Sequence, residues 1–216
     1  MQIKSLHKKI DLLQLLYGDS SLQAIYGAGC INKPKIMFIF MNPTARNITA
    51  DKNWRGLRAP WLGTKNVWGI FYKLGFLPKS IYQKTQTIKS SGWTLEFCNK
   101  IYSELKKKNV YITNLAKCTQ LDARPLKDVI FKKYLELTKM EISLIQPKNI
   151  ISFGNQVSSI LLSKPVSVGN YKNTEHEILE IGGGVFKIYP THYPVGQGRR
   201  NMPIANKRIK IILKSK

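Results

Sequence analysis

The chain has 216 residues, 43% of them apolar, which is enough for one globular domain with a sizeable core and argues against a disordered or fibrous protein. Lysine and arginine number 35 against 12 aspartate and glutamate residues, giving a formal charge of +23 that favours a polyanionic partner such as nucleic acid. A lysine-rich proteome is an alternative source of part of this excess. No apolar run approaches the roughly 20 residues that span a bilayer, and no signal-peptide core is present, so we expect an intracellular protein of the cytoplasm with no membrane partner.

The first predicted element is an amphipathic helix that ends before Gly18 and packs on the rest of the domain. Apolar residues recur there at helical spacing: Ile3, Leu6, Ile10, Leu13 and Tyr17, with Leu12 and Leu16 widening the stripe.

Four short runs rich in apolar and β-branched residues follow at wide intervals and predict strands at 36–40, 110–113, 150–153 and 186–189. Helical patterns separate them, at 67–74, 94–107, 126–145 and 156–162. Strands that alternate with helices indicate parallel pairing through crossovers. The predicted fold is therefore a single α/β domain over 1–216, a three-layer α/β/α arrangement with a short, mainly four-stranded parallel sheet. The glycines at 182–184 predict a hairpin or strand connection rather than a phosphate-binding loop, because no helix pattern follows them.

Polar residues follow each predicted strand directly. Asn42 and Asn114 come after the first two strands, Gly154 after the third, and the segment 190–194 after the fourth. Ligands of parallel α/β sheets bind beyond the carboxyl ends of the strands. We therefore expect these four segments to form one pocket.

The cysteines are three in number and far apart in the sequence: Cys30, Cys98 and Cys118. No pair has the spacing of a zinc knuckle, and an odd number of distant cysteines does not indicate a disulfide framework. The sequence predicts three buried, reduced thiols, with no metal and no cofactor.

Five segments, in order, carry a family resemblance: IMFIFMNP at 36–43, GLRAPWLG at 56–63, VYITNLAKC at 110–118, IISFG at 150–154 and YPTHYP at 189–194. Together they resemble the uracil-DNA glycosylase superfamily over about 24–201, and the chain is most similar to the bacterial and archaeal branch called family 4. That branch usually carries an iron-sulfur cluster on four cysteines, of which only Cys118 has a counterpart here. An Asn at position 42, where family 4 usually has an acidic residue, is similar to the mismatch-specific and single-strand-selective branches.

The resemblance implies a role for each strand-end residue. Asn42 would hold a water against the sugar, Met41 and Trp61 would contact the flipped base, Asn114 would read the Watson–Crick edge of uracil, and His192 would donate to the base oxygen. Four of these residues have an alternative interpretation, in which they only support the fold. For Asn42, Trp61, Asn114 and His192 these are an Asn-Pro turn, a core Trp, a turn-forming strand-end Asn and a structural His.

The last motif departs from the family pattern, because His192 stands one place early and is followed by Tyr193. If the fourth strand runs on regularly, this displacement turns the imidazole away and brings Tyr193 to the pocket. If the chain leaves the strand at Pro190, His192 can swing back towards the base. We favour the second geometry.

Basic residues near the motifs predict contacts with DNA phosphates. The glycine-rich loop at 195–201 resembles the family's DNA-wedging loop, with Gly196 allowing close approach and Arg199 and Arg200 supplying charge. Lys117 and Arg124 are further candidates, although a lysine or arginine in so basic a chain is more often simple surface.

These expectations combine into one functional prediction: a monomeric, monofunctional DNA glycosylase that flips out and excises uracil or a related deaminated base and initiates base excision repair. The alternative is a catalytically weak DNA or lesion binder of the same fold. A nucleotide-binding enzyme of small molecules is disfavoured, because no glycine-rich loop joins the first strand to a helix.

Overall fold

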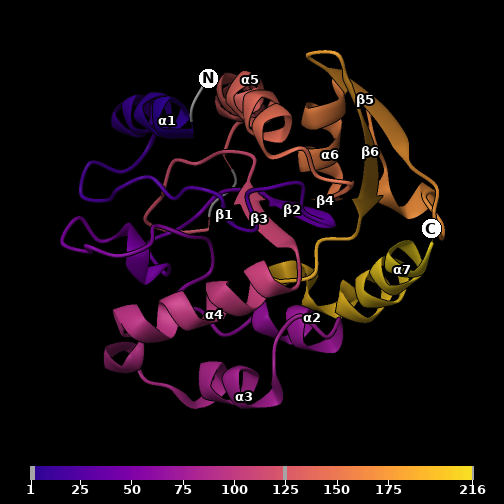
Figure 1. The fold of residues 1–216 in the computed structure, drawn as a ribbon. Helices are drawn as coiled ribbons and strands as arrows, with labels where there is room; N and C mark the ends of the chain where they lie inside the picture. The colour runs from indigo at the N-terminus through magenta and orange to yellow at the C-terminus, as the bar shows by residue number, and fades with distance from the viewer. Residues whose placement is uncertain (1–2, 124–125, 216) are drawn as a thin grey trace.

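A six-stranded sheet lies between two layers of helices in the computed structural model, which describes residues 3–123 and 126–215 (Figure 1). The strand order is β1-β3-β2-β4-β6-β5. The strands are β1 (Ala28–Gly29), β2 (Ile36–Phe40), β3 (Val110–Asn114), β4 (Asn149–Phe153), β5 (Glu177–Ile181) and β6 (Gly184–Thr191). The central four strands, β3, β2, β4 and β6, are parallel to one another, whereas β1 and β5 pair antiparallel at the two edges.

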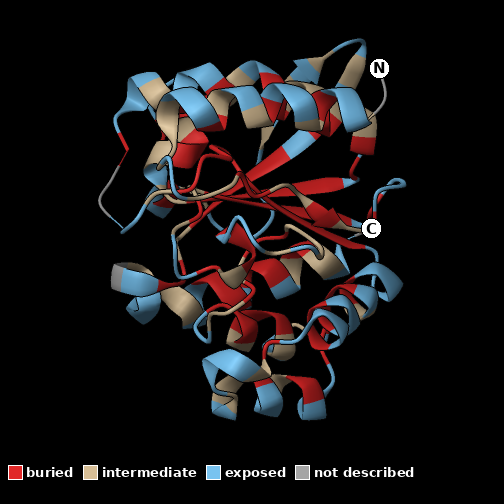
Figure 2. Ribbon diagram, turned by 90° about the vertical axis from the view of Figure 1, so that its left-hand side faces the viewer, coloured by how far each residue is buried: buried red, intermediate tan, exposed pale blue. Residues whose placement is uncertain are grey.

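Helices cover both faces of this sheet, as the edge-on view of Figure 2 shows. One layer contains α1 (Ile3–Tyr17), α5 (Asp128–Ile145) and α6 (Asn155–Leu162). The other contains α2 (Trp68–Lys73), α4 (Leu95–Lys107) and α7 (Met202–Lys214), with α3 (Lys79–Thr87) packed outside against α2. Short 3-10 turns lie at η1 (Ile48–Ala50), η2 (Ser90–Gly92), η3 (Val168–Asn170) and η4 (Gly196–Asn201).

The core is divided by the sheet into two clusters. Phe38 and Phe40 of β2 pack among α2, α4 and α7, whereas Met37 and Ile39 pack among α1, α5 and α6. Every residue of β2, β3 and β4 is buried, because a parallel sheet with helices on both faces has no solvent-facing side. This explains why the predicted strands are continuous apolar runs rather than alternating ones.

The predicted fold class is confirmed, and the four predicted strands are the parallel centre of the sheet. The number of strands was wrong, because the sheet has six. β1 is only two residues long, and β5 alternates between half-buried and exposed positions, so neither resembles a buried strand in sequence. The predicted hairpin at 182–184 is confirmed: Gly182 (φ +54°) and Gly183 (φ +80°) connect β5 to β6.

The prediction for the first helix needs correction, and two helices were not predicted. The first helix has the predicted extent, but Leu12 and Leu16 do not widen its buried stripe, since they are 61% and 69% exposed while Gln14 is buried. The Gln14 side chain accepts from the Thr119 main chain and donates to main-chain carbonyls, and these bonds place a polar residue inward. Helices α3 and α7 were missed.

Candidate functional site

The carboxyl ends of β2 and β3 meet at Phe40 and Asn114, which are partners in the strand register. The Leu115 main-chain nitrogen donates to the Phe40 carbonyl at 2.7 Å, which keeps the two chains together beyond the last pair. On the other side, the Phe40 ring lies 4.6 Å from the ring of Phe153, the last residue of β4. Phe40 is therefore at the centre of the strand-end cluster, which we define as Phe40, Trp61, Asn114, Phe153 and Tyr193.

Trp61 joins this cluster from the loop after β2. Its ring meets the Phe40 ring nearly edge-on, with centroids 5.0 Å apart. The Trp61 backbone has φ +69°, a left-handed conformation that bulky residues rarely adopt, and its indole Nε1 is buried with no hydrogen-bond partner among the residues described. A strained backbone and an unsatisfied donor in one residue are typical of a functional position.

Hydrogen bonds on both sides hold the Trp61 loop in this conformation. The Tyr102 hydroxyl of α4 donates to the Pro60 carbonyl at 2.7 Å, and the Thr64 hydroxyl donates to the Trp61 carbonyl at 2.8 Å. Gly63 (φ +92°) lies so close to Ile48 that a side chain there would meet the Ile48 main-chain nitrogen at 2.9 Å. The indole is thus presented from a rigid loop.

Asn114 contributes the second unsatisfied polar group. Its side chain is 2% exposed, and its Oδ1 has no hydrogen-bond partner within the described part of the chain. Alternation along β3 places Asn114 on the same face as Ile112, towards α2 and α4. An amide oxygen that is buried without a partner costs about 1–3 kcal/mol, which a bound donor would recover.

The structure brings Tyr193, and not His192, to the strand-end cluster. The Tyr193 ring meets the Phe40 ring edge-on at 6.2 Å and packs against Gly154. Burial raises the pKa of the Tyr193 hydroxyl well above its ordinary value, so this group remains a neutral donor at physiological pH. His192 instead lines a separate pocket of about 250 Å³ beside Tyr171 and Arg208.

The prediction that the chain leaves the fourth strand at Pro190 was therefore wrong. β6 continues to Thr191, with Pro190 opposite Ser152 in the register. Proline has no N–H to give, but its carbonyl accepts from Arg208 Nη1 at 2.6 Å, and Gly154 donates to the Thr191 carbonyl at 2.8 Å. These bonds keep the backbone regular as far as Thr191, and His192 then lies beside α7 in the neighbouring pocket.

The chain was also compared with models of protein families. The model of the uracil DNA glycosylase superfamily matches residues 26–213. The chain belongs to this superfamily. Its match extends from just before β1 into α7 and so includes the sheet and all five members of the strand-end cluster. A comparison with curated proteins found no match.

In this superfamily member, the chain bends at Met41, directly after β2. Asn42 is half-buried, and its Nδ2 donates to the Pro43 carbonyl at 3.1 Å. The Met41 carbonyl accepts from the Ala116 main chain at 3.0 Å, which keeps this bend beside the loop that follows Asn114. The Asn42 amide nitrogen is thus engaged locally, by the carbonyl of the next residue.

Of the residues predicted to contact DNA phosphates, some are exposed and one is buried. Arg199 and Arg200 are exposed on η4, which begins at Gly196 (φ +59°) and leads into α7. Lys117 was wrongly predicted as a phosphate contact: it is fully buried and its Nζ pairs with Glu141 Oε2 at 2.8 Å. Arg124 lies outside the described residues.

The cysteines do not fit the iron-sulfur cluster of family 4. All three are buried and free, and Cys98 belongs to the core cluster on one face of the sheet whereas Cys118 belongs to the cluster on the other. Burial raises the pKa of the Cys98 thiol to about 12 and also raises that of Cys118. Across residues 3–123 and 126–215 there is no group of three potential ligands that could hold a metal ion.

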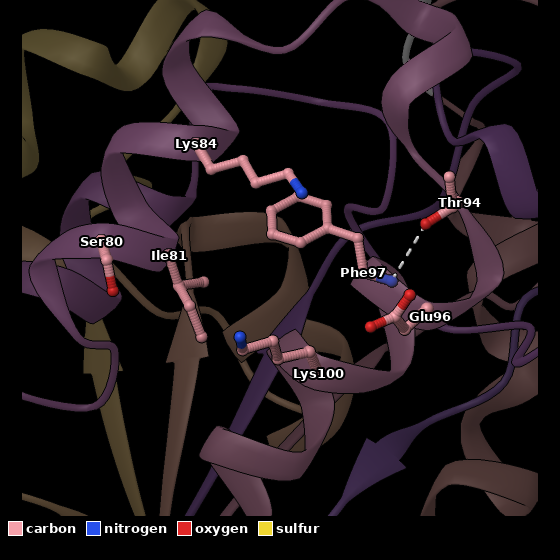
Figure 3. A pocket seen from close by; sticks show the side chains of 7 residues that line it. All are labelled: Ser80, Ile81, Lys84, Thr94, Glu96, Phe97 and Lys100. Carbon is pink, nitrogen blue, oxygen red and sulfur yellow. Dashed lines mark hydrogen bonds between the residues drawn. The ribbon is translucent and has the colours of Figure 1, made fainter.

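Another pocket lies between α3 and α4, where Lys84 Nζ is 4.5 Å from the centre of the Phe97 ring (Figure 3). Thr94 caps α4 there by accepting from the Phe97 main-chain nitrogen at 3.2 Å. None of the residues predicted from the sequence lines this pocket. No helix of the described chain has the length and apolar character needed to cross a bilayer.

Proposed function

We propose that the protein is a monofunctional DNA glycosylase that flips uracil or a related deaminated base out of DNA and hydrolyses its N-glycosidic bond, initiating base excision repair. The observation that carries the proposal is the pair of buried, unsatisfied groups, Asn114 Oδ1 and Trp61 Nε1, beside Phe40 in a member of the uracil DNA glycosylase superfamily. Polar atoms left without partners in a rigid, otherwise apolar site favour a ligand that supplies them.

Uracil carries a hydrogen-bond donor and carbonyl acceptors, which are the kinds of partner that the unsatisfied groups of this site lack. Its ring N–H can donate to Asn114 Oδ1, and its carbonyl oxygen can accept from the amide nitrogen of the same side chain. Trp61, which is only partly buried, offers an aromatic surface on which an extruded base can stack, and stacking recovers part of the cost of flipping.

Bond cleavage leaves negative charge on the departing base and positive charge on the sugar, so a donor to the base oxygen matters more than a strong nucleophile. Tyr193 is the donor that the geometry favours, because it adjoins Phe40 and burial keeps it protonated. Asn42 and Met41 follow β2 directly, and the Asn42 amide oxygen would hold the attacking water. His192 lines the neighbouring pocket and has no part in this step.

DNA is the proposed partner, bound by a monomer through its phosphates. Arg199 and Arg200 on η4 are exposed and follow Tyr193 closely in the chain, so they can grip the backbone beside the flipped nucleotide. The net charge of +23 adds long-range attraction.

One observation favours the alternative, a DNA or lesion binder with little turnover. The Asn42 amide nitrogen already donates to the Pro43 carbonyl, and an amide cannot accept a proton from the attacking water. Release of free base decides between the two functions.

The test is incubation with duplex and single-stranded oligonucleotides that carry uracil, hypoxanthine, xanthine or a mismatched thymine, followed by alkaline cleavage at abasic sites. We expect cleavage at uracil with the wild-type protein and its loss in Asn114→Ala. Binding of the uracil oligonucleotide without base release would support the alternative.

A further inference from the structure

A buried ion pair, formed by Lys117 and Glu141, contacts the main chain of Asn114. Lys117 Nζ is 2.8 Å from Glu141 Oε2 of α5, and the two side chains are 0% and 2% exposed. The same ammonium group donates to the main-chain carbonyl of Asn114 and to Thr138 Oγ1 at 3.3 Å. All three hydrogens of the ammonium are therefore engaged, one of them on the residue proposed to read the base.

Glu141 holds β3 from the same side. Its Oε1 accepts from the Tyr111 hydroxyl at 2.8 Å, and both carboxylate oxygens lie 3.1 Å from the Thr113 hydroxyl. Tyr111 and Thr113 alternate with Ile112 and Asn114 along the strand. The carboxylate thus fixes the face of β3 opposite to the one that presents the Asn114 amide.

The peptide that follows Asn114 is held as well. Its nitrogen, from Leu115, donates to the Phe40 carbonyl at 2.7 Å, and its oxygen, from Asn114, accepts from Lys117. The Leu115 carbonyl accepts from Thr138 Oγ1 at 3.1 Å. This peptide is therefore tied to β2 directly and to α5 through Lys117, whereas the Asn114 Oδ1 has no partner in the described part of the chain.

Stability alone does not explain this arrangement. Desolvation lowers the pKa of Lys117, which Glu141 opposes, and two charges taken out of water recover little net free energy. Replacement of both members of a buried ion pair by apolar residues is often neutral or stabilising. A network with every donor used does, however, specify one position of the backbone.

We propose that Lys117 and Glu141 are positioning residues, which hold the Asn114 main chain so that the side-chain amide faces the flipped base. This inference rests on the proposed function, because it concerns the same base-reading residue. Neither residue touches the substrate, and each acts through Asn114.

The test compares two double variants. Lys117→Met/Glu141→Leu removes the buried ion pair, and the matched control Glu136→Leu/Lys139→Met removes a more exposed ion pair on α5, the helix of Glu141. We expect uracil excision in single turnover to fall about 10- to 100-fold in the buried double variant, the loss that follows misplacement of a reacting group by about 1 Å. The DNA dissociation constant stays near wild type, and the control is unaffected. The melting temperature of the buried double variant falls, because the Tyr111 and Thr113 hydroxyls lose their acceptor, so excision is measured well below it. A folded double variant that excises uracil within about twofold of wild type overturns the proposal.

A second measurement decides the matter if the double variant does not fold. Thr138→Val keeps the side-chain shape and removes only the hydroxyl that links Lys117 to the Leu115 carbonyl. We expect it to slow excision in the wild-type background and to have no further effect in Asn114→Ala. An equal loss in both backgrounds shows a role independent of Asn114 and overturns the proposal.

Nuclear magnetic resonance separates failure of this inference from failure of the proposed function. The side-chain amide signal of Asn114, identified by its absence in Asn114→Ala, is expected to shift in the Thr138→Val protein. The amide of Asn47, which donates to the Ala59 carbonyl at 2.8 Å, is the internal control and stays in place. An unshifted Asn114 signal contradicts positioning, whereas a wild-type protein that releases no base contradicts only the proposed function.

Discussion

Trp61 and Phe40 meet nearly edge-on at 5.0 Å, with the Trp61 backbone held in a left-handed conformation at φ +69°. The relationship joins a loop to the carboxyl end of β2, and it leaves the indole N–H buried without a partner among the residues described. The left-handed backbone and the unsatisfied donor both destabilise the fold. Their presence in this aromatic pair therefore favours a role in binding over one in stability.

The first prediction concerns this ring. Trp61→Ala is expected to reduce uracil excision about 5- to 150-fold, the effect of losing about 1–3 kcal/mol of base stacking. Trp61→Phe keeps an aromatic surface and removes the unsatisfied N–H, so its melting temperature is expected to stay at or above that of wild type. Single-turnover rates and thermal unfolding measure both effects. A Trp61→Phe protein as slow as Trp61→Ala would show that the N–H contributes more to base binding than the ring face does.

The second prediction concerns Asn114. Asn114→Ala is expected to reduce excision about 10²- to 10³-fold, because the site loses its groups for the uracil edge. Since Asn114 Oδ1 makes no hydrogen bond to the described residues, the melting temperature is expected to change by less than about 4 °C, the shift that 1 kcal/mol produces in a chain of this size. A much larger drop in melting temperature would assign Asn114 to the fold instead.

The third prediction compares the two residues of the last motif. Tyr193→Phe is expected to slow excision about 10²-fold, as for the loss of one donor to a developing anion, and His192→Ala is expected to have a small effect. The reason is position: Tyr193 adjoins Phe40, whereas His192 lines the pocket with Tyr171 and Arg208. The opposite order of single-turnover rates would return the donor role to His192.

The fourth prediction concerns DNA affinity. It is expected to fall steeply as salt rises, and Arg199→Ala/Arg200→Ala is expected to lower the slope of log affinity against log salt by about 2, one for each phosphate that is no longer neutralised. Lys8→Ala/Lys9→Ala removes the same charge from exposed positions on α1 and serves as the control. Equal slopes for the two double variants would mean that the arginines contribute only general charge.

The sequence predicted the parts of the site that local patterns determine. The buried runs 36–40 and 110–113 identify parallel strands, and parallel strands place Asn42 and Asn114 at one edge of the sheet. Edge strands were not predicted because β1 is two residues long and β5 is half exposed. The helix α7 was missed because two residues on its buried side, Asn206 and Arg208, are polar and interrupt its apolar spacing.

The remaining errors depend on partners that are distant in sequence. A lysine is usually a surface residue, and the carboxylate that compensates the buried charge of Lys117 belongs to Glu141, 24 positions later on α5. The Pro190 carbonyl accepts from Arg208 of α7, and Pro190 lies within the strand, opposite Ser152. No local pattern shows either contact.

The central claim is base excision, and the most direct measurement is chromatographic detection of free uracil after incubation of the wild-type protein with a uracil-containing oligonucleotide and excess chelator. The donors gathered around Phe40 are one side-chain amide, an indole and a phenol, so release of uracil is expected to proceed with the chelator present. The same amount of Asn114→Ala protein is expected to release about 10²- to 10³-fold less per unit time. Tight binding of the oligonucleotide with no free uracil would contradict the claim and leave the protein a binder of damaged DNA.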